Sequence, residues 1–160
     1  MIILPFLHYD LIFNLTKMGT MLMEQNKEFK IAVLEDSEFY NSILTRQLEH
    51  YTSTLTIEKG YKFDIQSYIS SDDCLRNIKP DIDILFLDYY LGNGITAPEV
   101  LKKIKQKCKT CKIIIISQEK TIKTAMRTIS DGAIEFIYKD VYALPKSCFI
   151  LEDIINGKYA

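Results

Sequence analysis

The sequence lacks tryptophan, has little glycine and proline, and contains no apolar run long enough to cross a bilayer. Its 6 glycines and 4 prolines among 160 residues exclude collagen-like and low-complexity chains. The apolar stretch from Met1 to Leu15 is broken by Pro5, His8 and Asp10, and it is shorter than the roughly 20 residues that a spanning helix needs. It also lacks the basic start of a secretory signal. The sequence therefore predicts a globular domain with no membrane partner, whose first residues are an amphipathic anchor, a docking segment or the product of a mis-called start.

A strong charge of one sign is also missing, because the formal net charge is −1 at pH 7. No overall field draws such a chain to nucleic acid, so we expect no direct nucleic-acid partner. Positive charge is concentrated only between residues 102 and 112, which include six lysines. A solvated helix face is the ordinary explanation of this run, and a docking patch for a partner is the alternative.

The four cysteines do not form the pattern of a disulfide framework. Cys108 and Cys111 have the spacing of a redox or zinc motif, but no second cysteine or histidine pair completes four ligands. We therefore expect reduced thiols and a cytoplasmic protein.

Short apolar runs alternate with amphipathic stretches from Phe29 onward, which predicts five strand–helix units. Such a series forms a parallel sheet with helices on both faces, an α/β fold. The helix after the first strand is expected to turn Phe39, Ile43, Leu44 and Leu48 inward, and the fourth helix Ile122, Ala125, Met126 and Ile129. The predicted strands cover residues 31–34, 63–67, 82–87, 112–117 and 135–138.

Reactive side chains follow each central strand of this predicted sheet. Glu35 and Asp36 follow the first strand, and Asp88 ends the third. Ser117 ends the fourth and Lys139 follows the fifth. Because ligands of open parallel sheets bind beyond the carboxyl ends of the strands, we expect these groups to lie close together.

Three clustered carboxylates repel one another unless a cation joins them. An all-oxygen site of this kind suits Mg²⁺, which prefers one or two carboxylates, water and a phosphate oxygen. A carboxylate can also attack phosphorus and form an aspartyl phosphate. The sequence therefore predicts magnesium-assisted phosphoryl transfer, in which Lys139 adds positive charge and the Ser117 hydroxyl donates a hydrogen bond to a phosphoryl oxygen.

The residues of this site and their order resemble the receiver domain of two-component response regulators. The resemblance rests on Glu35-Asp36, on the segment Leu85 to Leu91 around Asp88, on Ile116-Ser117 and on Phe136 to Lys139. It implies a flavodoxin-like, doubly wound five-stranded sheet with strand order 2-1-3-4-5. It places the domain at residues 29–156, with residues 1–28 as an N-terminal extension that is disordered or the product of a mis-called start, and with no output domain.

The resemblance also implies a role for each site residue. Asp88 is the phosphoacceptor, and Asp36 binds Mg²⁺ directly. Glu35 binds it mainly through water, and the backbone carbonyl of Tyr90 is a further ligand. Ser117 senses the phosphoryl group and Lys139 pairs with it, while Phe136 occupies the position of a switch aromatic that rotates inward as Ser117 moves.

The partners implied by the resemblance are a histidine kinase or phosphotransfer protein and a downstream protein or a second copy of the chain. The downstream contact would use the fourth helix, fifth strand and fifth helix, where Met126, Tyr138 and Tyr142 lie. The expected protein is a signalling switch and not a turnover enzyme. It acts alone or belongs to a longer regulator.

The sequence departs from the family pattern at three places, one of which is the segment from Tyr51 to Tyr61, which is longer than usual. Asp140 follows Lys139 where many receivers have proline, and Gly92 lies where proline often follows the aspartate. Tyr90, two residues after Asp88, is bulky enough to shield an acyl phosphate from water, which predicts slow dephosphorylation.

Two other functions compete with a phosphorylated receiver. A pseudo-receiver binds partners without phosphorylation, which the intact set of Asp36, Asp88, Ser117 and Lys139 disfavours. A phosphatase resembling the haloacid-dehalogenase family uses a second aspartate two residues after the nucleophile, and this position is Tyr90 here.

Overall fold

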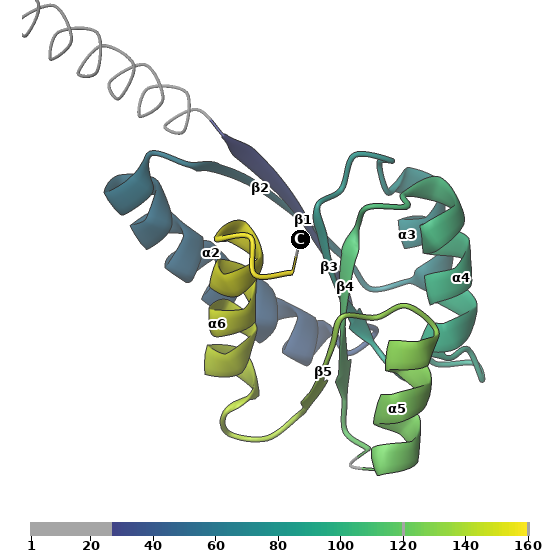
Figure 1. Cartoon of the computed structure of the whole chain (residues 1–160). Coiled ribbons are helices and arrows are strands. Elements are labelled where there is room, and N and C mark those ends of the chain that lie inside the picture. The colour runs from purple at the N-terminus through teal and green to yellow at the C-terminus, as the bar shows by residue number, and fades with distance from the viewer. Residues whose placement is uncertain (1–26, 120, 160) are drawn as a thin grey trace, which may run out of the picture.

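Five parallel strands form one sheet in the order β2-β1-β3-β4-β5 in the computed structural model, which describes residues 27–119 and 121–159 (Figure 1). This order confirms the predicted fold class. The predicted N-terminal extension lies almost wholly outside the described residues. The strands are β1 (Glu28–Leu34), β2 (Lys62–Tyr68), β3 (Ile84–Asp88), β4 (Lys112–Ser117) and β5 (Glu135–Tyr138).

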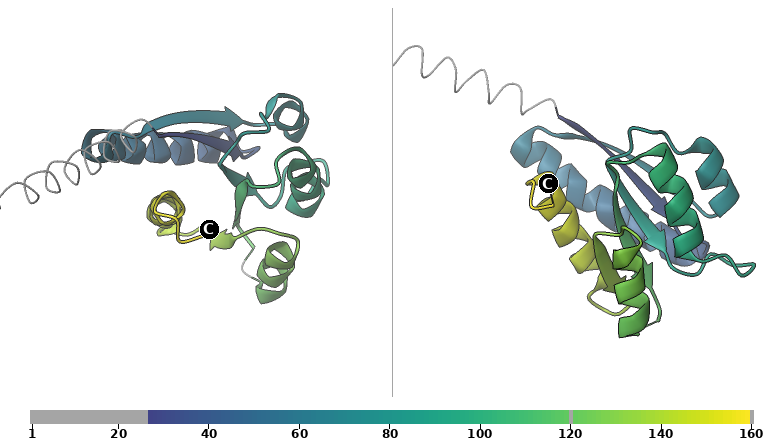
Figure 2. Two further views of the ribbon diagram at one scale, coloured as in Figure 1. Left: turned by 45° about the horizontal axis from the view of Figure 1, so that its top comes forward. Right: turned by 45° about the vertical axis from the view of Figure 1, so that its right-hand side comes forward.

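Five described helices cover the two faces of the sheet (Figure 2). On one face lie α2 (Glu38–Lys59) and α6 (Ala143–Ile155), and on the other lie α3 (Ser71–Asn77), α4 (Ala97–Lys107) and α5 (Ile122–Ser130). Neither layer, within the described residues, has a helix that is both long and apolar enough to cross a membrane.

The core is divided by the sheet into two apolar layers. Alternate residues of β4 enter opposite layers, with Ile113 and Ile115 packed beside α3 and α4, and Ile114 and Ile116 packed beside α2 and α6. All four side chains are almost completely buried. Burial on both faces explains why β4 is an unbroken apolar run, whereas β2, an edge strand, alternates apolar and polar residues.

Two predicted inward faces are wrong in part. Phe39 on α2 is 74% exposed, because it lies two residues before Asn41, the first member of the buried stripe that continues through Leu44 and Leu48. On α5, Met126 and Ile129 are 66% and 44% exposed. Thr128 is instead the buried side chain among those described on α5, and the predicted burial of Ile122 lies outside the described side chains.

A side-chain capping hydrogen bond is present at the start of some helices and absent at others. Ser70 caps α3 by accepting the Asp73 N–H at 3.4 Å. Thr96 precedes α4, but its side chain makes no capping hydrogen bond, so the order of Thr96 and Glu99, which is typical of a capping box, does not form one here. The polar stretch after Thr52 continues α2 to Lys59, and Gly60 ends it with φ of 71°.

Candidate functional site

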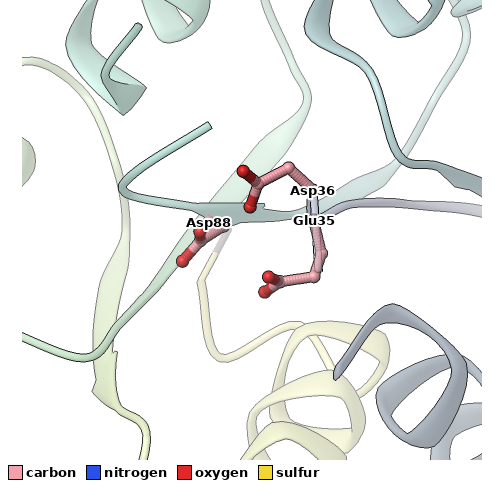
Figure 3. Close-up of side chains that lie close together, drawn as sticks. All are labelled: Glu35, Asp36 and Asp88. Atoms are coloured by element: carbon pink, nitrogen blue, oxygen red, sulfur yellow. The ribbon is translucent and has the colours of Figure 1, made fainter. Parts of the chain in front are cut away.

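Three carboxylates meet at the carboxyl ends of β1 and β3, where the strand order reverses direction (Figure 3). Glu35 and Asp36 follow β1, and Asp88 ends β3. One oxygen from each lies within 4.8 Å of the others. Glu35 and Asp88 are buried, whereas Asp36 is exposed. The sheet thus brings together the three acidic residues that the sequence predicts.

Lys139 enters this cluster from the end of β5. Its ammonium lies 2.6 Å from Glu35 Oε2 and 2.8 Å from Asp88 Oδ1, and its side chain is 6% exposed. A cation between two buried carboxylates offsets part of their repulsion and of their loss of hydration. The structure thus places Lys139 in contact with Asp88, while the pairing of Lys139 with a phosphoryl group stays a prediction.

Burial dominates the electrostatics of the two inner carboxylates. Loss of solvent raises the pKa of Asp88, and the hydrogen bond and charge of Lys139 oppose this shift, while the charge of Asp36 adds to it. Burial likewise raises the pKa of Glu35 against the opposing hydrogen bond from Lys139. Even with Lys139 present, the cluster keeps a net negative charge, and burial leaves this charge poorly solvated.

Both carboxylate oxygens of Glu35 accept hydrogen bonds. Oε1 accepts the Ser37 N–H at 3.2 Å, and Oε2 accepts the ammonium of Lys139. The buried Asn41 side chain donates to the Glu35 carbonyl at 3.2 Å and to the Tyr68 carbonyl at 2.9 Å. Because both oxygens of Glu35 have partners, contact with a metal through water fits this residue better than direct ligation. Asn41 is not among the predicted site residues.

A cavity of about 320 Å³ opens above the carboxylates. Gly92 forms part of its wall with φ of +69°, and a Cβ at this position would lie 3.1 Å from Asp36 Oδ2. Both the backbone conformation and the close approach therefore favour glycine here. The cavity is lined by Glu35, Asp36, Ser37, Asp88, Tyr90, Gly92, Gln118 and Lys139.

Ser117 ends β4 next to this cavity but does not line it. Its side chain is fully buried, and its oxygen accepts the Glu119 N–H at 3.0 Å. Gln118, which the sequence did not indicate, lines the cavity instead. Phe136 on β5 is partly buried and packs against the core layer of α3 and α4. The sensing role of Ser117 and the switch role of Phe136 stay predictions.

Tyr90 stands at the mouth of the cavity and is 49% exposed. Its hydroxyl donates a hydrogen bond to the carboxylate of Glu119, which also accepts the Thr121 hydroxyl at 3.0 Å. This bond links the loop after β3 to the loop after β4. The position of the ring fits the predicted shielding role, whereas metal ligation by the Tyr90 carbonyl stays a prediction.

The cysteine motif lies away from this site. Cys108 and Cys111 are buried in the core layer beside α4, and burial raises the pKa of the Cys111 thiol. Protonated, buried thiols are poor nucleophiles and poor metal ligands. Within the described ranges, Glu35, Asp36 and Asp88 form the one cluster of potential metal ligands.

The donor set fits a hard divalent cation. Carboxylate oxygens close together, one of them exposed, leave room for the water ligands that Mg²⁺ retains. Burial and, to a smaller extent, the neighbouring carboxylate raise the pKa of Asp88 and of Glu35, and a bound cation would stabilise their ionised forms. Asp36 and Asp88 are the residues best placed to hold the ion.

Comparison with known proteins identifies both the family and the fold. The sequence model described as "Response regulator receiver domain" matches residues 31–144. Among solved structures, a response regulator receiver domain protein from Clostridium thermocellum has 21% identity and a TM-score of 0.65, and the alignment covers 82% of this chain and 97% of the other. The non-phosphorylated HemR receiver domain from Leptospira biflexa has 22% identity and a TM-score of 0.64, with 79% and 94% covered.

A further similar structure carries a modified aspartate. It is a response regulator protein from Burkholderia pseudomallei with a phosphorylated aspartic acid, a calcium ion and citrate, with 20% identity, a TM-score of 0.55, and 79% of this chain and 72% of the other covered. No curated protein matches the chain.

Proposed function

Because the chain belongs to the response regulator receiver domain family, we propose that it is a signalling switch that accepts a phosphoryl group on Asp88. The donor is a histidine kinase or a phosphotransfer protein, and the reaction depends on Mg²⁺. The observation that carries this proposal is the contact of Asp88 with Lys139 inside a cluster of three carboxylates. The phosphorylated aspartic acid of the Burkholderia relative supports it.

The proposed reaction forms one bond and breaks one. An oxygen of the Asp88 carboxylate attacks phosphorus, and the bond from phosphorus to the donor nitrogen breaks, so that the electron pair returns to the departing imidazole. Bound Mg²⁺ supplies positive charge for the phosphoryl oxygens. Lys139 exchanges its contact with the Asp88 oxygen for one with the arriving group, while Glu35 keeps the ammonium close.

Acetyl phosphate tests this proposal without a cognate kinase. We expect the purified protein to gain the mass of one phosphoryl group in the presence of Mg²⁺, with acetate as the leaving group. Chelation of the metal is expected to prevent the gain, and hydroxylamine to remove the group, because an acyl phosphate is labile to this nucleophile. A folded protein that gains no mass would favour a pseudo-receiver, and steady hydrolysis of a chromogenic phosphate ester would favour a phosphatase.

Magnesium binding is expected to weaken as the pH falls, starting above the usual carboxyl range of about pH 4. Burial raises the pKa of Asp88 and of Glu35, and protons compete with the cation for the ionised oxygens. In metal-free protein the same shifts reduce the free energy of unfolding as the pH rises through the raised pKa values. Thermal unfolding with graded Mg²⁺ at several pH values measures both effects. A Mg²⁺ affinity that is constant between pH 5 and 7.5 would show that no raised carboxyl pKa controls the site.

Replacement of Tyr90 by asparagine is expected to shorten the lifetime of the phosphorylated protein. The ring lies at the mouth of the cavity, and its bond to Glu119 holds it there, so that a smaller side chain admits water to the acyl phosphate. We expect dephosphorylation to become faster, because exclusion of water from a site protects a reactive intermediate from hydrolysis. Decay of the phosphorylated mass after removal of acetyl phosphate measures the lifetime. An unchanged decay rate would show that Tyr90 does not shield the site.

The proposed read-out surface is formed by α5, β5 and the start of α6. Met126 on α5 and Tyr142 before α6 are 66% and 73% exposed, and a groove of about 440 Å³ runs between α5 and β5. Phe136 lines this groove, so a rotation of its ring would alter the surface that a partner contacts. We propose that a downstream protein or a second copy of the chain binds here.

A further inference from the structure

The helix α4 carries a concentration of positive charge that the proposed phosphoryl site does not use. Residues 97–112 contain six lysines and one acidic residue, Glu99, a net charge of +5 in a chain of net charge −1. Several of the lysines are one helical turn apart, as Lys102 and Lys105 are, and like charges at this spacing repel. This clustering of lysines therefore lowers the stability of the fold, so stability does not explain why the lysines are there.

None of these lysines is paired with a carboxylate among the ion pairs of the described residues. Lys105 donates to the Cys111 carbonyl at 2.9 Å, and Lys107 donates to the Leu75 carbonyl. A neutral carbonyl oxygen accepts a hydrogen bond but does not cancel a charge. The positive charge of α4 thus remains available to a partner.

A groove of about 460 Å³ lies between α4 and α5, which run side by side on the same face of the sheet (Figure 2). Pro98 and the buried Leu101 form its apolar part. Lys102, Lys105 and Arg127 add three cations. Glu99 and Asp131 complete the lining, and Asp131 pairs with Arg127 at 3.9 Å, so the groove is not uniformly basic.

We propose that this groove binds an acidic segment of a partner protein. An apolar side chain of the segment packs on Pro98 and Leu101, and neighbouring carboxylates pair with Lys102, Lys105 and Arg127. A nucleic-acid backbone fits less well, because its unbroken row of phosphates would meet Glu99 and Asp131. A bilayer surface fits less well too, because it cannot enter a concave groove. The surface is distinct from the phosphoryl site and does not require Asp88.

A labelled peptide rich in glutamate with one central leucine tests this assignment in the full chain. We expect binding that weakens with added salt, and no binding of the same peptide with glutamine in place of glutamate. The double variant Lys102→Glu with Arg127→Gln is expected to bind about tenfold more weakly, because charge complementarity across the rim is lost. The matched control, Arg46→Glu with Lys62→Gln, makes the same change in net charge on other exposed surfaces and is expected to bind within twofold of wild type.

The other outcomes overturn the proposal. Equal loss in both double variants would mean that net charge alone attracts the peptide. Binding of anionic vesicles or of DNA that the peptide does not compete for would assign the charge to that partner instead. Peptide binding by Asp88→Asn is expected to equal that of wild type, so failure here is separable from failure of phosphoryl uptake.

A second inference rests on a different observation, the contact of Tyr40 with Lys139. The ammonium of Lys139 lies 4.4 Å from the centroid of the Tyr40 ring, within the range of a cation–π interaction. The hydroxyl of Tyr40 is buried and is the one such side-chain oxygen or nitrogen, among the described residues, without a hydrogen-bond partner. The ring of Tyr40 therefore contacts Lys139, whereas the Tyr40 hydroxyl makes no hydrogen bond.

We infer that Tyr40 is a positioning residue whose ring holds the Lys139 ammonium where the phosphoryl group arrives. This inference rests on the proposed function of the site. A lysine side chain has four flexible carbon–carbon links, and two carboxylates alone do not fix its approach. The ring supplies a third contact from α2, so the ammonium stays near Asp88 when its bond to that carboxylate is exchanged.

Two substitutions separate the ring from the hydroxyl. Tyr40→Phe is expected to take up phosphate from acetyl phosphate within twofold of wild type and to unfold at the same or a higher urea concentration, because only an unpaired buried hydroxyl is lost. Tyr40→Leu is expected to take it up about tenfold more slowly, a loss typical of one cation–π contact. Tyr40→Leu is also expected to weaken the binding of beryllofluoride while leaving Mg²⁺ affinity unchanged, since Asp36 and Asp88 are intact.

Equal effects of the two substitutions would overturn the inference, whether both slow the reaction or neither does. A parallel loss of Mg²⁺ and beryllofluoride affinity in Tyr40→Leu would indicate a general structural defect and would also overturn it. If wild-type protein itself takes up no phosphate, the proposed function fails and not the role of Tyr40 alone.

Discussion

Asp88→Asn is expected to gain no phosphoryl group under conditions in which the wild-type protein is fully modified. The amide has no anionic oxygen to attack phosphorus, although it has almost the same shape as the carboxylate. Glu35 also lines the cavity and contacts Lys139, but its two oxygens accept hydrogen bonds from Ser37 and Lys139, so we expect Asp88 to be the acceptor. Intact mass after incubation with acetyl phosphate and Mg²⁺ measures the gain.

The same substitution is expected to stabilise the metal-free protein. Burial and the charge of Asp36 raise the pKa of Asp88, so the native state disfavours its ionised form at neutral pH, and a neutral amide removes this cost. Urea unfolding followed by circular dichroism in the presence of a chelator measures the difference. Loss of modification together with higher stability would separate lost chemistry from a lost fold.

Asp72→Asn provides a matched control, because Asp72 is an exposed aspartate in the first turn of α3, away from the cavity. This variant is expected to take up one phosphoryl group as wild type does. A mass gain on Asp88→Asn would contradict the proposed acceptor, and peptide mapping would then locate the modified residue.

The fold follows from the sequence because both faces of the central strands are buried. Strands such as β4, an unbroken apolar run from Lys112 to Ser117, have few alternatives to a position inside a parallel sheet. The carboxyl ends of the strands then place Glu35, Asp36, Asp88 and Lys139 at one edge of the sheet. The apolar pattern of the strands and the order of these residues therefore predict the cluster.

Helix faces were harder to predict, because periodicity does not say how far a helix extends over the sheet. Met126 and Ile129 lie at the spacing of a core face, yet both are exposed, and Thr128 is the buried side chain among those described on α5. Phe39 is a similar case in the first turn of α2. The spacing of these apolar residues is helical as predicted, but their side chains face solvent, where another molecule can contact them.

Contacts between distant segments were beyond sequence reasoning. Asn41 supports the end of β1 through two backbone carbonyls, and Tyr40 meets Lys139 from almost 100 residues away in the chain. The bond from Tyr90 to Glu119 likewise joins two loops. Each depends on the relative placement of whole elements, which residue types and local spacing do not encode.

Lys139→Met is expected to lower the free energy of unfolding by about 3–5 kcal/mol at neutral pH without metal, as removal of one partner from a buried ion pair does. Methionine keeps most of the apolar stem but leaves Glu35 and Asp88, both buried, without their cation. Urea unfolding against wild type measures the loss. Lys146→Met is the matched control, because Lys146 is half exposed and its pairing with Glu135 is at 3.8 Å, so we expect a loss below about 1 kcal/mol.

The deficit of Lys139→Met is expected to depend on pH and on metal in a defined direction. Without the ammonium, the raised pKa values of Glu35 and Asp88 rise further, so instability appears as the pH increases through them and fades as the carboxylates take up protons below. Saturating Mg²⁺ is expected to restore part of the stability, because the cation replaces the missing charge.

Phosphoryl uptake by Lys139→Met is expected to stay at least about 10²-fold slower even in saturating Mg²⁺, since a group that stabilises developing charge is lost. The two losses should therefore respond differently to the metal: stability recovers and reactivity does not. If Mg²⁺ restored both, Lys139 would only balance the charge of the carboxylates. If Lys139→Met unfolded like Lys146→Met, the buried contacts of Lys139 would contribute nothing to the fold, and its effect on uptake would be the whole of its role.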